Sequence, residues 1–90
     1  MILATTTVEN VDRFLEVFST KVADKRAHYG SKGATVFRDP TEDNRVWGLF
    51  DMDQAAWAKF LSDPEVSEFV KEAGALGKPE APQLLGSYRA

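Results

Sequence analysis

Residues 33–51 read GATVFRDPTEDNRVWGLFD, and this stretch predicts a β-hairpin. Two runs of strand-forming residues flank the segment 40–44, whose residue types favour a turn. An antiparallel strand with one solvated face normally alternates apolar and polar side chains, but these runs carry apolar groups on both faces. In the first run, one face carries Ala34, Val36 and Arg38, and the other carries Thr35, Phe37 and Asp39. In the second run, one face carries Trp47 and Leu49, and the other carries Val46 and Phe50. The hairpin therefore predicts a sheet that needs a cover on each side.

The length and composition indicate one globular domain spanning residues 1–90, with 43% hydrophobic and 28% charged residues. A net charge of −3 gives no general attraction for nucleic acid or anionic membrane, so neither partner is expected. No apolar run approaches the roughly 20 residues that span a bilayer. The first residues lack a basic region and a long apolar stretch, so no signal peptide is expected and a cytoplasmic protein is predicted.

The residues before the hairpin predict a strand followed by a helix. The β-branched, threonine-rich run from Ile2 to Val8 is typical of a strand. Asn10 is a good N-cap for a helix that we expect to continue to Tyr29 and to stop at Gly30. Its buried stripe is predicted to hold Val11, Phe14, Leu15, Phe18, Val22 and Tyr29.

The residues after the hairpin predict a second helix that is broken near Pro64. Asp53 is expected to cap the first segment, which carries Trp57 and Phe60 on its buried side. Two restart signals overlap at residues 62–65: Asp63 as N-cap before Pro64, or a capping box between Ser62 and Glu65. Either way, the second segment ends at Gly74, and a loop rich in Gly and Pro leads to a last predicted strand over Gln83–Arg89.

The predicted order βαββαβ indicates an α+β, ferredoxin-like fold, with a four-stranded antiparallel sheet and two helices on one face. The helices cover only one side of such a sheet. The other side retains one member of each apolar pair of the hairpin, and the sequence leaves open which members these are. Contiguous exposed apolar surface usually marks an interface or a ligand groove. We therefore expect a second body, most simply another copy of this chain, to cover the open face.

In its element order, broken second helix and terminal strand, the chain resembles the dimeric α/β barrel superfamily over essentially its whole length. This superfamily includes antibiotic-biosynthesis monooxygenases and stress-responsive barrel proteins, in which two ferredoxin-like sheets pack face to face. The resemblance implies a homodimer, a last strand that reaches toward the other subunit, and chemistry that needs no cofactor. In the monooxygenase branch a Trp lies on the second helix, where Trp57 stands here.

Candidate catalytic residues are few. His28 is the only histidine and is a candidate base near neutral pH, although we favour the alternative that it is a solvated histidine stabilising a helix C-terminus. Arg38 is a candidate anchor for an anionic or carbonyl-bearing ligand, with an ion pair or an exposed strand end as the alternative. The candidate ligand-binding residues are Trp47, Trp57, Tyr88, Phe37 and Leu49. One His and no Cys give no support for a metal site.

Three functions remain open. The first is a homodimer that binds a small apolar or aromatic molecule between its sheets and, as an enzyme, acts as a cofactor-independent monooxygenase, cyclase or isomerase, with Arg38, His28 and Tyr88 as its polar groups. The second is a non-catalytic barrel that carries a ligand or acts as a stability module. The third is an RNA-recognition domain, because Arg45–Phe50 matches part of the signature of that fold, although the first strand lacks an aromatic residue on which to stack a base.

Overall fold

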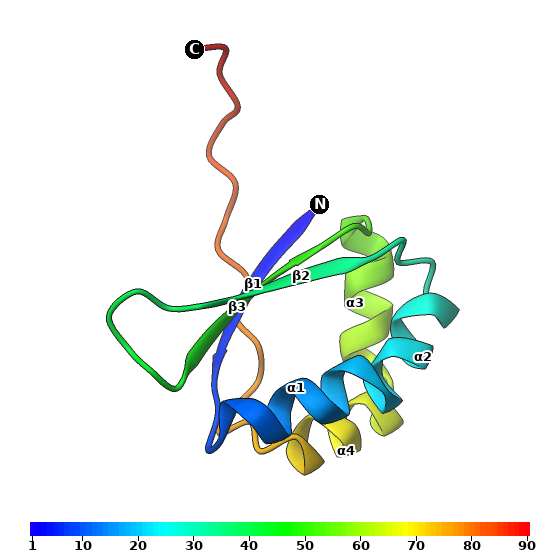
Figure 1. Ribbon diagram of the computed structural model, residues 1–90. Coiled ribbons are helices and arrows are strands. Elements are labelled where there is room, and N and C mark those ends of the chain that lie inside the picture. The colour runs from blue at the N-terminus through cyan, green and yellow to red at the C-terminus, as the bar shows by residue number, and fades with distance from the viewer.

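A computed structural model describes all 90 residues, and it shows an α+β protein with a small antiparallel sheet covered on one face by four helices (Figure 1). The strands and helices follow one another in the order β1 (Ile2–Thr7), α1 (Val11–Ser19), α2 (Lys21–His28), β2 (Ala34–Arg38), β3 (Arg45–Phe50), α3 (Gln54–Ser62) and α4 (Pro64–Glu72). No helix of the protein is long and apolar enough to cross a lipid bilayer.

The sheet has the strand order β1-β3-β2, so β3 is its central strand. Both pairings are antiparallel, as the predicted hairpin requires. Gly48 of β3 lies between Ala4 of β1 and Val36 of β2. The outer edge of β1 is the place where a fourth strand would complete the predicted sheet.

The structure decides which residues of the hairpin face the helices. Val46 and Phe50 are buried beneath the helices, at 3% and 6% exposure. The opposite side chains, Phe37, Trp47 and Leu49, lie on the other side of the sheet. No helix lies on that side (Figure 1). We call this side the open face; it also carries Leu3, Thr5, Thr7, Thr35 and Arg45.

The first predicted helix is interrupted at Thr20, and this corrects the expectation of one helix from Val11 to Tyr29. The Asn10 cap is confirmed, because its side chain accepts a hydrogen bond of 2.9 Å from the Arg13 N–H. Thr20 leaves the helical conformation, with φ −115° and ψ −86°, and its hydroxyl donates to the Glu16 carbonyl at 2.7 Å. A threonine hydroxyl that bonds to the preceding turn competes with the helical backbone, so the chain restarts as α2.

The predicted break in the second helix is confirmed, and the structure selects one of the two restart signals. Asp53 caps α3, and its carboxylate accepts from the Ala56 N–H at 2.7 Å. Asp63 caps α4 in the same way, accepting from the Glu65 N–H at 2.8 Å, with Pro64 as the first helical residue. Ser62 instead donates its hydroxyl to the Ala58 carbonyl, so no capping box forms.

Residues 83–89 do not form the predicted fourth strand within the single chain. Residues 75–80, which we call the strap, run antiparallel along the outer edge of β1 instead. The Leu76 N–H donates to Thr7, and Thr5 and Glu80 exchange two backbone hydrogen bonds of 2.8 and 2.9 Å. In this antiparallel pairing, each residue after Glu80 lies opposite a residue one position nearer to Met1. Leu84 would therefore lie opposite Met1, and β1 has no residue left to pair with Leu85 or with later residues. The tail, residues 81–90, is exposed throughout and points away from the body (Figure 1).

Candidate functional site

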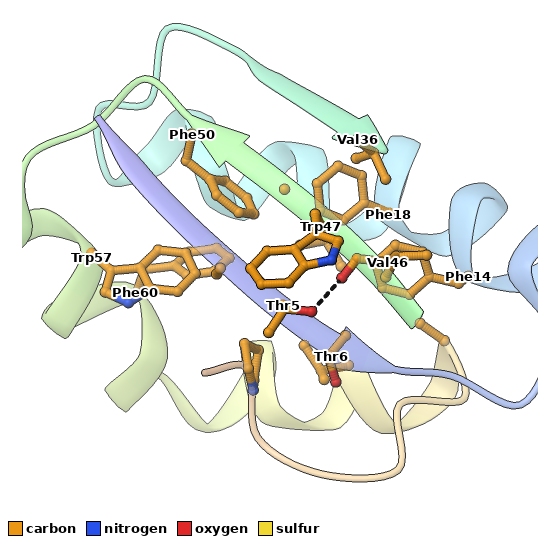
Figure 2. Close-up of a pocket in the computed structure, with 16 residues that line it drawn as sticks. Thr5, Thr6, Phe14, Phe18, Val36, Val46, Trp47, Phe50, Trp57 and Phe60 are labelled. Atoms are coloured by element: carbon orange, nitrogen blue, oxygen red, sulfur yellow. Dashed lines mark hydrogen bonds between the residues drawn. The ribbon is translucent and has the colours of Figure 1, made fainter. Parts of the chain in front are cut away.

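An apolar cavity of about 50 Å³ lies between the sheet and the helices (Figure 2). Twelve of its sixteen lining residues are hydrophobic, and none of the sixteen is classed as exposed. Aromatic rings form much of the wall: Phe14 and Phe18 from α1, Phe50 from β3, and Trp57 and Phe60 from α3. The helices bring these rings together because each presents its apolar stripe to the sheet.

The rings make a continuous cluster. The centroid of the Phe50 ring lies 4.9 Å from that of Trp57 and 5.9 Å from that of Phe18. Trp57 stacks on Phe60 at 5.7 Å, and Phe14 stacks on Phe18 at 5.3 Å. These separations are typical of favourable aromatic pairs, so the rings of the wall stabilise one another.

Small residues on the sheet provide the space. Gly48 and Ala4 face each other across β3 and β1 and both line the cavity. A Cβ atom at Gly48 would lie 2.7 Å from Cε1 of Phe50, so the ring of Phe50 lies where a side chain would begin. A larger residue at this point of the sheet would displace that ring.

The two polar side chains of the cavity wall already have hydrogen-bond partners. The Thr5 hydroxyl donates to the Val46 carbonyl at 2.9 Å, and the Thr6 hydroxyl donates to the Gly77 carbonyl of the strap at 3.4 Å (Figure 2 draws the first bond). No buried side-chain nitrogen or oxygen of the protein lacks a partner. The cavity therefore offers little to a water molecule, which needs two to four polar partners.

The open face has a different character, with apolar side chains beside a fixed polar group. Phe37 and Leu3 are 52% and 40% exposed, and Phe37 lies directly beside Trp47 across the hairpin. The Trp47 indole N–H donates to the Asp39 carboxylate at 2.7 Å, and the Arg45 guanidinium lies 5.2 Å from the centre of the indole ring. The bond from Trp47 and those from the Thr41 N–H and hydroxyl hold the pKa of Asp39 well below its usual range. Trp47 is thus held in one orientation at the centre of this face.

The candidate catalytic residues, His28 and Arg38, lie apart from each other and from the cavity. His28 is exposed at the C-terminal end of α2, where its ring meets the Tyr29 ring edge-on at 4.9 Å. Arg38 is exposed at the far end of β2, beside Asn10 and Asn44. The structure does not bring these two residues into one site.

The candidate ligand-binding residues fall into three places. Phe37, Trp47 and Leu49 lie together on the open face, whereas Trp57 is buried beneath the helices at 7% exposure. Tyr88 is 91% exposed in the tail. Trp47 and Trp57 nevertheless both line the cavity between the sheet and the helices, whereas Tyr88 lies outside it.

Two carboxylates with defined roles were missed by the sequence analysis. Asp39 looks like a turn residue in the sequence, but it binds the indole of Trp47 across the hairpin. Asp63 looks like a helix cap, but its second oxygen also accepts from Lys25 at 3.0 Å and from the Tyr29 hydroxyl at 2.8 Å. These bonds lower the pKa of Asp63 to about 2, and the bond from Lys25 has the largest effect. The bonds of Asp63 connect α2 to the junction of α3 and α4. Of the two carboxylates, only Asp39 had a signal in the sequence, because it lies eight residues before Trp47 across the predicted hairpin.

The protein has no cluster of three His, Cys, Asp or Glu side chains that could hold a metal ion. On the open face, the polar groups beside the Trp47 indole are the carboxylate of Asp39 and the guanidinium of Arg45. The open face therefore presents an apolar surface with one ordered indole and two charged groups next to it.

Solved structures share this fold. SnoaB, a cofactor-independent oxygenase from Streptomyces nogalater, superposes with a TM-score of 0.65 at 20% identity, over 96% of this chain and 92% of SnoaB. A conserved protein from Methanosarcina mazei Go1 gives a TM-score of 0.63 at 13% identity over 90% of this chain and 85% of its own. A candidate antibiotic biosynthesis monooxygenase from Deinococcus radiodurans gives 0.56 at 15% identity over 100% and 98%. No protein family and no curated protein matches the sequence itself. The predicted ferredoxin-like fold is thus supported by likeness to solved structures.

Proposed function

We propose that the protein is a homodimer whose two open faces enclose a small apolar or aromatic molecule. The observation that carries this proposal is the open face itself, on which Leu3, Phe37, Trp47 and Leu49 form one apolar surface. Burying a side chain of this size contributes roughly 1.5–3 kcal/mol. A second copy covers this surface most simply, because a two-fold axis brings the same patch of each subunit together.

The tail supports the same assembly. Leu84, Leu85 and Tyr88 are 79%, 88% and 91% exposed, and β1 of the same chain ends before it can pair with most of the tail. In the proposed dimer the tail extends across the partner as an added strand. This would place Tyr88 against the partner, and strand addition would satisfy the backbone groups of the tail.

The proposed chemistry is cofactor-independent oxygenation of the enclosed molecule. Support comes from the fold shared with SnoaB, whose description as a cofactor-independent oxygenase applies to that protein. In this chain the ordered ring of Trp47 supplies a stacking surface, and Arg45 and Asp39 lie next to it. His28 lies at the end of α2, and Arg38 lies at the end of β2 opposite Val46, so neither belongs to the open face in the single chain.

A non-catalytic dimeric barrel is the second candidate. It is favoured by the hydrogen bonds of Asp39, the carboxylate beside the open face, because Trp47 and Thr41 already occupy its oxygens. In this alternative the partner's side chains fill the space between the sheets. A ligand site and a filled interface differ in whether an added aromatic molecule binds.

Two matched leucine substitutions test the dimer. Leu3 on the open face and Leu15 on α1 have the same exposure, 40%. Sedimentation at micromolar concentration should give a dimer for the unaltered protein and for Leu15→Lys, and a monomer for Leu3→Lys, because only the latter places a charge in the interface. A monomeric unaltered protein, or a dimer unaffected by Leu3→Lys, would contradict the proposal.

Ligand binding and turnover need separate measurements. The fluorescent probe 8-anilinonaphthalene-1-sulfonate should bind the unaltered dimer and should bind more weakly to Trp47→Ala, with Leu15→Ala as the control. Oxygen uptake should then be followed with a panel of phenolic aromatic compounds and no added flavin or metal. Probe binding without oxygen uptake on any compound would favour the non-catalytic barrel over the oxygenase.

A further inference from the structure

We infer that a groove between the strap and helices α3 and α4 binds an organic carboxylate, whose charged group is held by Lys71 and Lys78. The apolar part of this molecule lies against Val70 and Pro79. The inference goes beyond the proposed function, because the groove shares no residue with the open face and is formed by the single chain. It comes from the size of the groove, the charges along it and its position beside the cavity.

The groove is large enough for a small organic molecule, and its walls are fixed. Its volume is about 620 Å³, within the roughly 300–1,000 Å³ that is typical of ligand sites. The strap, which forms one wall, is bonded at its start to both neighbours. The Ala75 N–H donates to the Val70 carbonyl of α4 at 3.2 Å, and the Leu76 N–H donates to the Thr7 carbonyl of β1 at 2.9 Å. The groove therefore exists before any ligand binds.

The charge of the groove is opposite to that of the whole protein. The chain has 14 acidic and 11 basic residues, but the eleven residues that line the groove include two lysines and no Asp or Glu. Lys71 belongs to α4 and Lys78 to the strap, so each wall carries one positive charge. The ion pairs of the protein use Lys21, Lys25 and Arg45 and neither of these two lysines. Both ammonium groups are therefore available to an anion.

Apolar side chains lie directly beside these charges. On α4, Val66 and Val70 form an apolar stripe along the groove, because residues four apart lie on one face of a helix. Ser67 and Lys71 form a polar stripe next to it. Leu76 lines the wall that the strap provides and is 63% exposed. An inorganic anion would use only the polar stripe, whereas an organic carboxylate uses both.

Val70 and Pro79 give the bound molecule a direction. Both residues are half-buried and line the cavity as well as the groove, so they separate the two spaces. Each is next in sequence to one of the exposed lysines, Lys71 or Lys78. The same two pairs of residues thus provide a charged outer edge and an apolar inner edge. A carboxylate at the outer edge turns the rest of the molecule toward the aromatic wall of the cavity.

Amide chemical shifts of the unaltered protein test the inference, with 2-naphthoate as the probe and 2-naphthylmethanol as its uncharged counterpart. The acid should shift the amides of Lys71, Leu76 and Lys78 in a saturable way, and the alcohol should bind there at least several-fold more weakly. Equal affinity for the two compounds, or no shift in the groove, would overturn the inference. Shifts confined to Phe37 and Leu49 would place the acid on the open face, which would overturn the inference and leave the proposed function standing.

Three identical substitutions separate local recognition from general charge attraction. Lys71→Gln and Lys78→Gln should each weaken binding of 2-naphthoate by about two- to five-fold, the range that an exposed ion pair gives, and leave binding of the alcohol unchanged. Lys32→Gln removes the same charge from an exposed position in the loop before β2 and should have no effect. Equal weakening by all three substitutions would show that only the net charge matters and would overturn the inference.

The tail is the other segment that could occupy the groove, because it follows the strap and exposes Leu84 and Leu85. Removal of residues 83–90 should leave the groove amides and the affinity for 2-naphthoate unchanged. If the truncation shifts those amides and raises the affinity several-fold, the tail fills the groove and the inference is wrong.

Discussion

At the residue scale, Gly48 affects both the packing of the central strand and the cavity beside it. The Phe50 ring occupies the place where a side chain at Gly48 would begin, and neighbouring rings hold Phe50 there. The residue therefore sets both the packing of the central strand and the shape of the cavity.

Gly48→Ala should lower the free energy of unfolding by about 1–3 kcal/mol, because the added Cβ must displace a buried ring. Gly77→Ala is the matched control, since a Cβ there meets no atom within 4 Å. Urea denaturation followed by circular dichroism measures both changes. A loss of stability at position 77 equal to that at position 48 would show that the Phe50 contact is not the cause.

Asp63 makes the stability of the protein depend on pH in the acid range. Its pKa falls from 3.8 to about 2 on folding, through bonds from Lys25 and Tyr29. A carboxylate whose folded pKa is lowered stabilises the protein above its unfolded pKa, and this contribution is lost as the pH falls toward the folded value.

The difference in unfolding free energy between the unaltered protein and Asp63→Asn should therefore be constant above about pH 5 and shrink between about pH 4 and pH 2. Urea titrations at a series of pH values measure it. Asp53→Asn, at the other helix cap, controls for the loss of capping. A difference that stays constant down to pH 2 would show that Asp63 is not ionised preferentially in the folded state.

At the scale of elements, the strap and the tail differ sharply although they are consecutive. The strap is bonded to β1 through Thr5 and Thr7 and contributes Pro79 to the cavity wall. The tail makes no hydrogen bond to the body and is exposed at every residue. The strap belongs to the folded body, and the tail is the segment that we propose contacts a partner.

Removing residues 83–90 should therefore leave the melting temperature of the monomeric Leu3→Lys variant unchanged, because no folded contact is lost. Removing residues 75–90 should lower it, because the edge of β1 loses its backbone partners. Differential scanning calorimetry of both truncations makes the comparison. A large loss of stability from the shorter truncation would show that the tail packs on its own subunit.

At the scale of the whole molecule, the helices cover only one of the two apolar faces of the hairpin. Val46 and Phe50 are covered by the chain itself, whereas Phe37 and Leu3 are not. The chain, with its extended tail, measures 39 × 32 × 19 Å, and all of its helices lie on one side of the sheet (Figure 1).

If two open faces associate, the melting temperature of the unaltered protein should rise with protein concentration, because a dimer is stabilised by mass action. The melting temperature of Leu3→Lys should not depend on concentration. Thermal unfolding across two decades of concentration measures this dependence. Parallel behaviour of the two proteins would argue that the open face makes no stable contact.

The sequence by itself determined the features that depend on neighbouring residues. The hairpin, the caps at Asn10 and Asp53, and the break at Pro64 follow from residue types a few positions apart, and the structure contains all of them. The alternation in the hairpin correctly separated Trp47 and Leu49 from Val46 and Phe50. Such features are local, so the chain need not be folded to reveal them.

Only the tertiary structure decided which face of the hairpin is covered, that the cavity forms over Gly48, and that the strap rather than residues 83–89 pairs with β1. It also separated His28, Arg38 and Trp57 from the open face and joined Asp39 to Trp47. These outcomes depend on the register of strands and on helix packing between residues far apart in the chain. Both faces of the hairpin are apolar, so composition alone could not say which one the helices would bury.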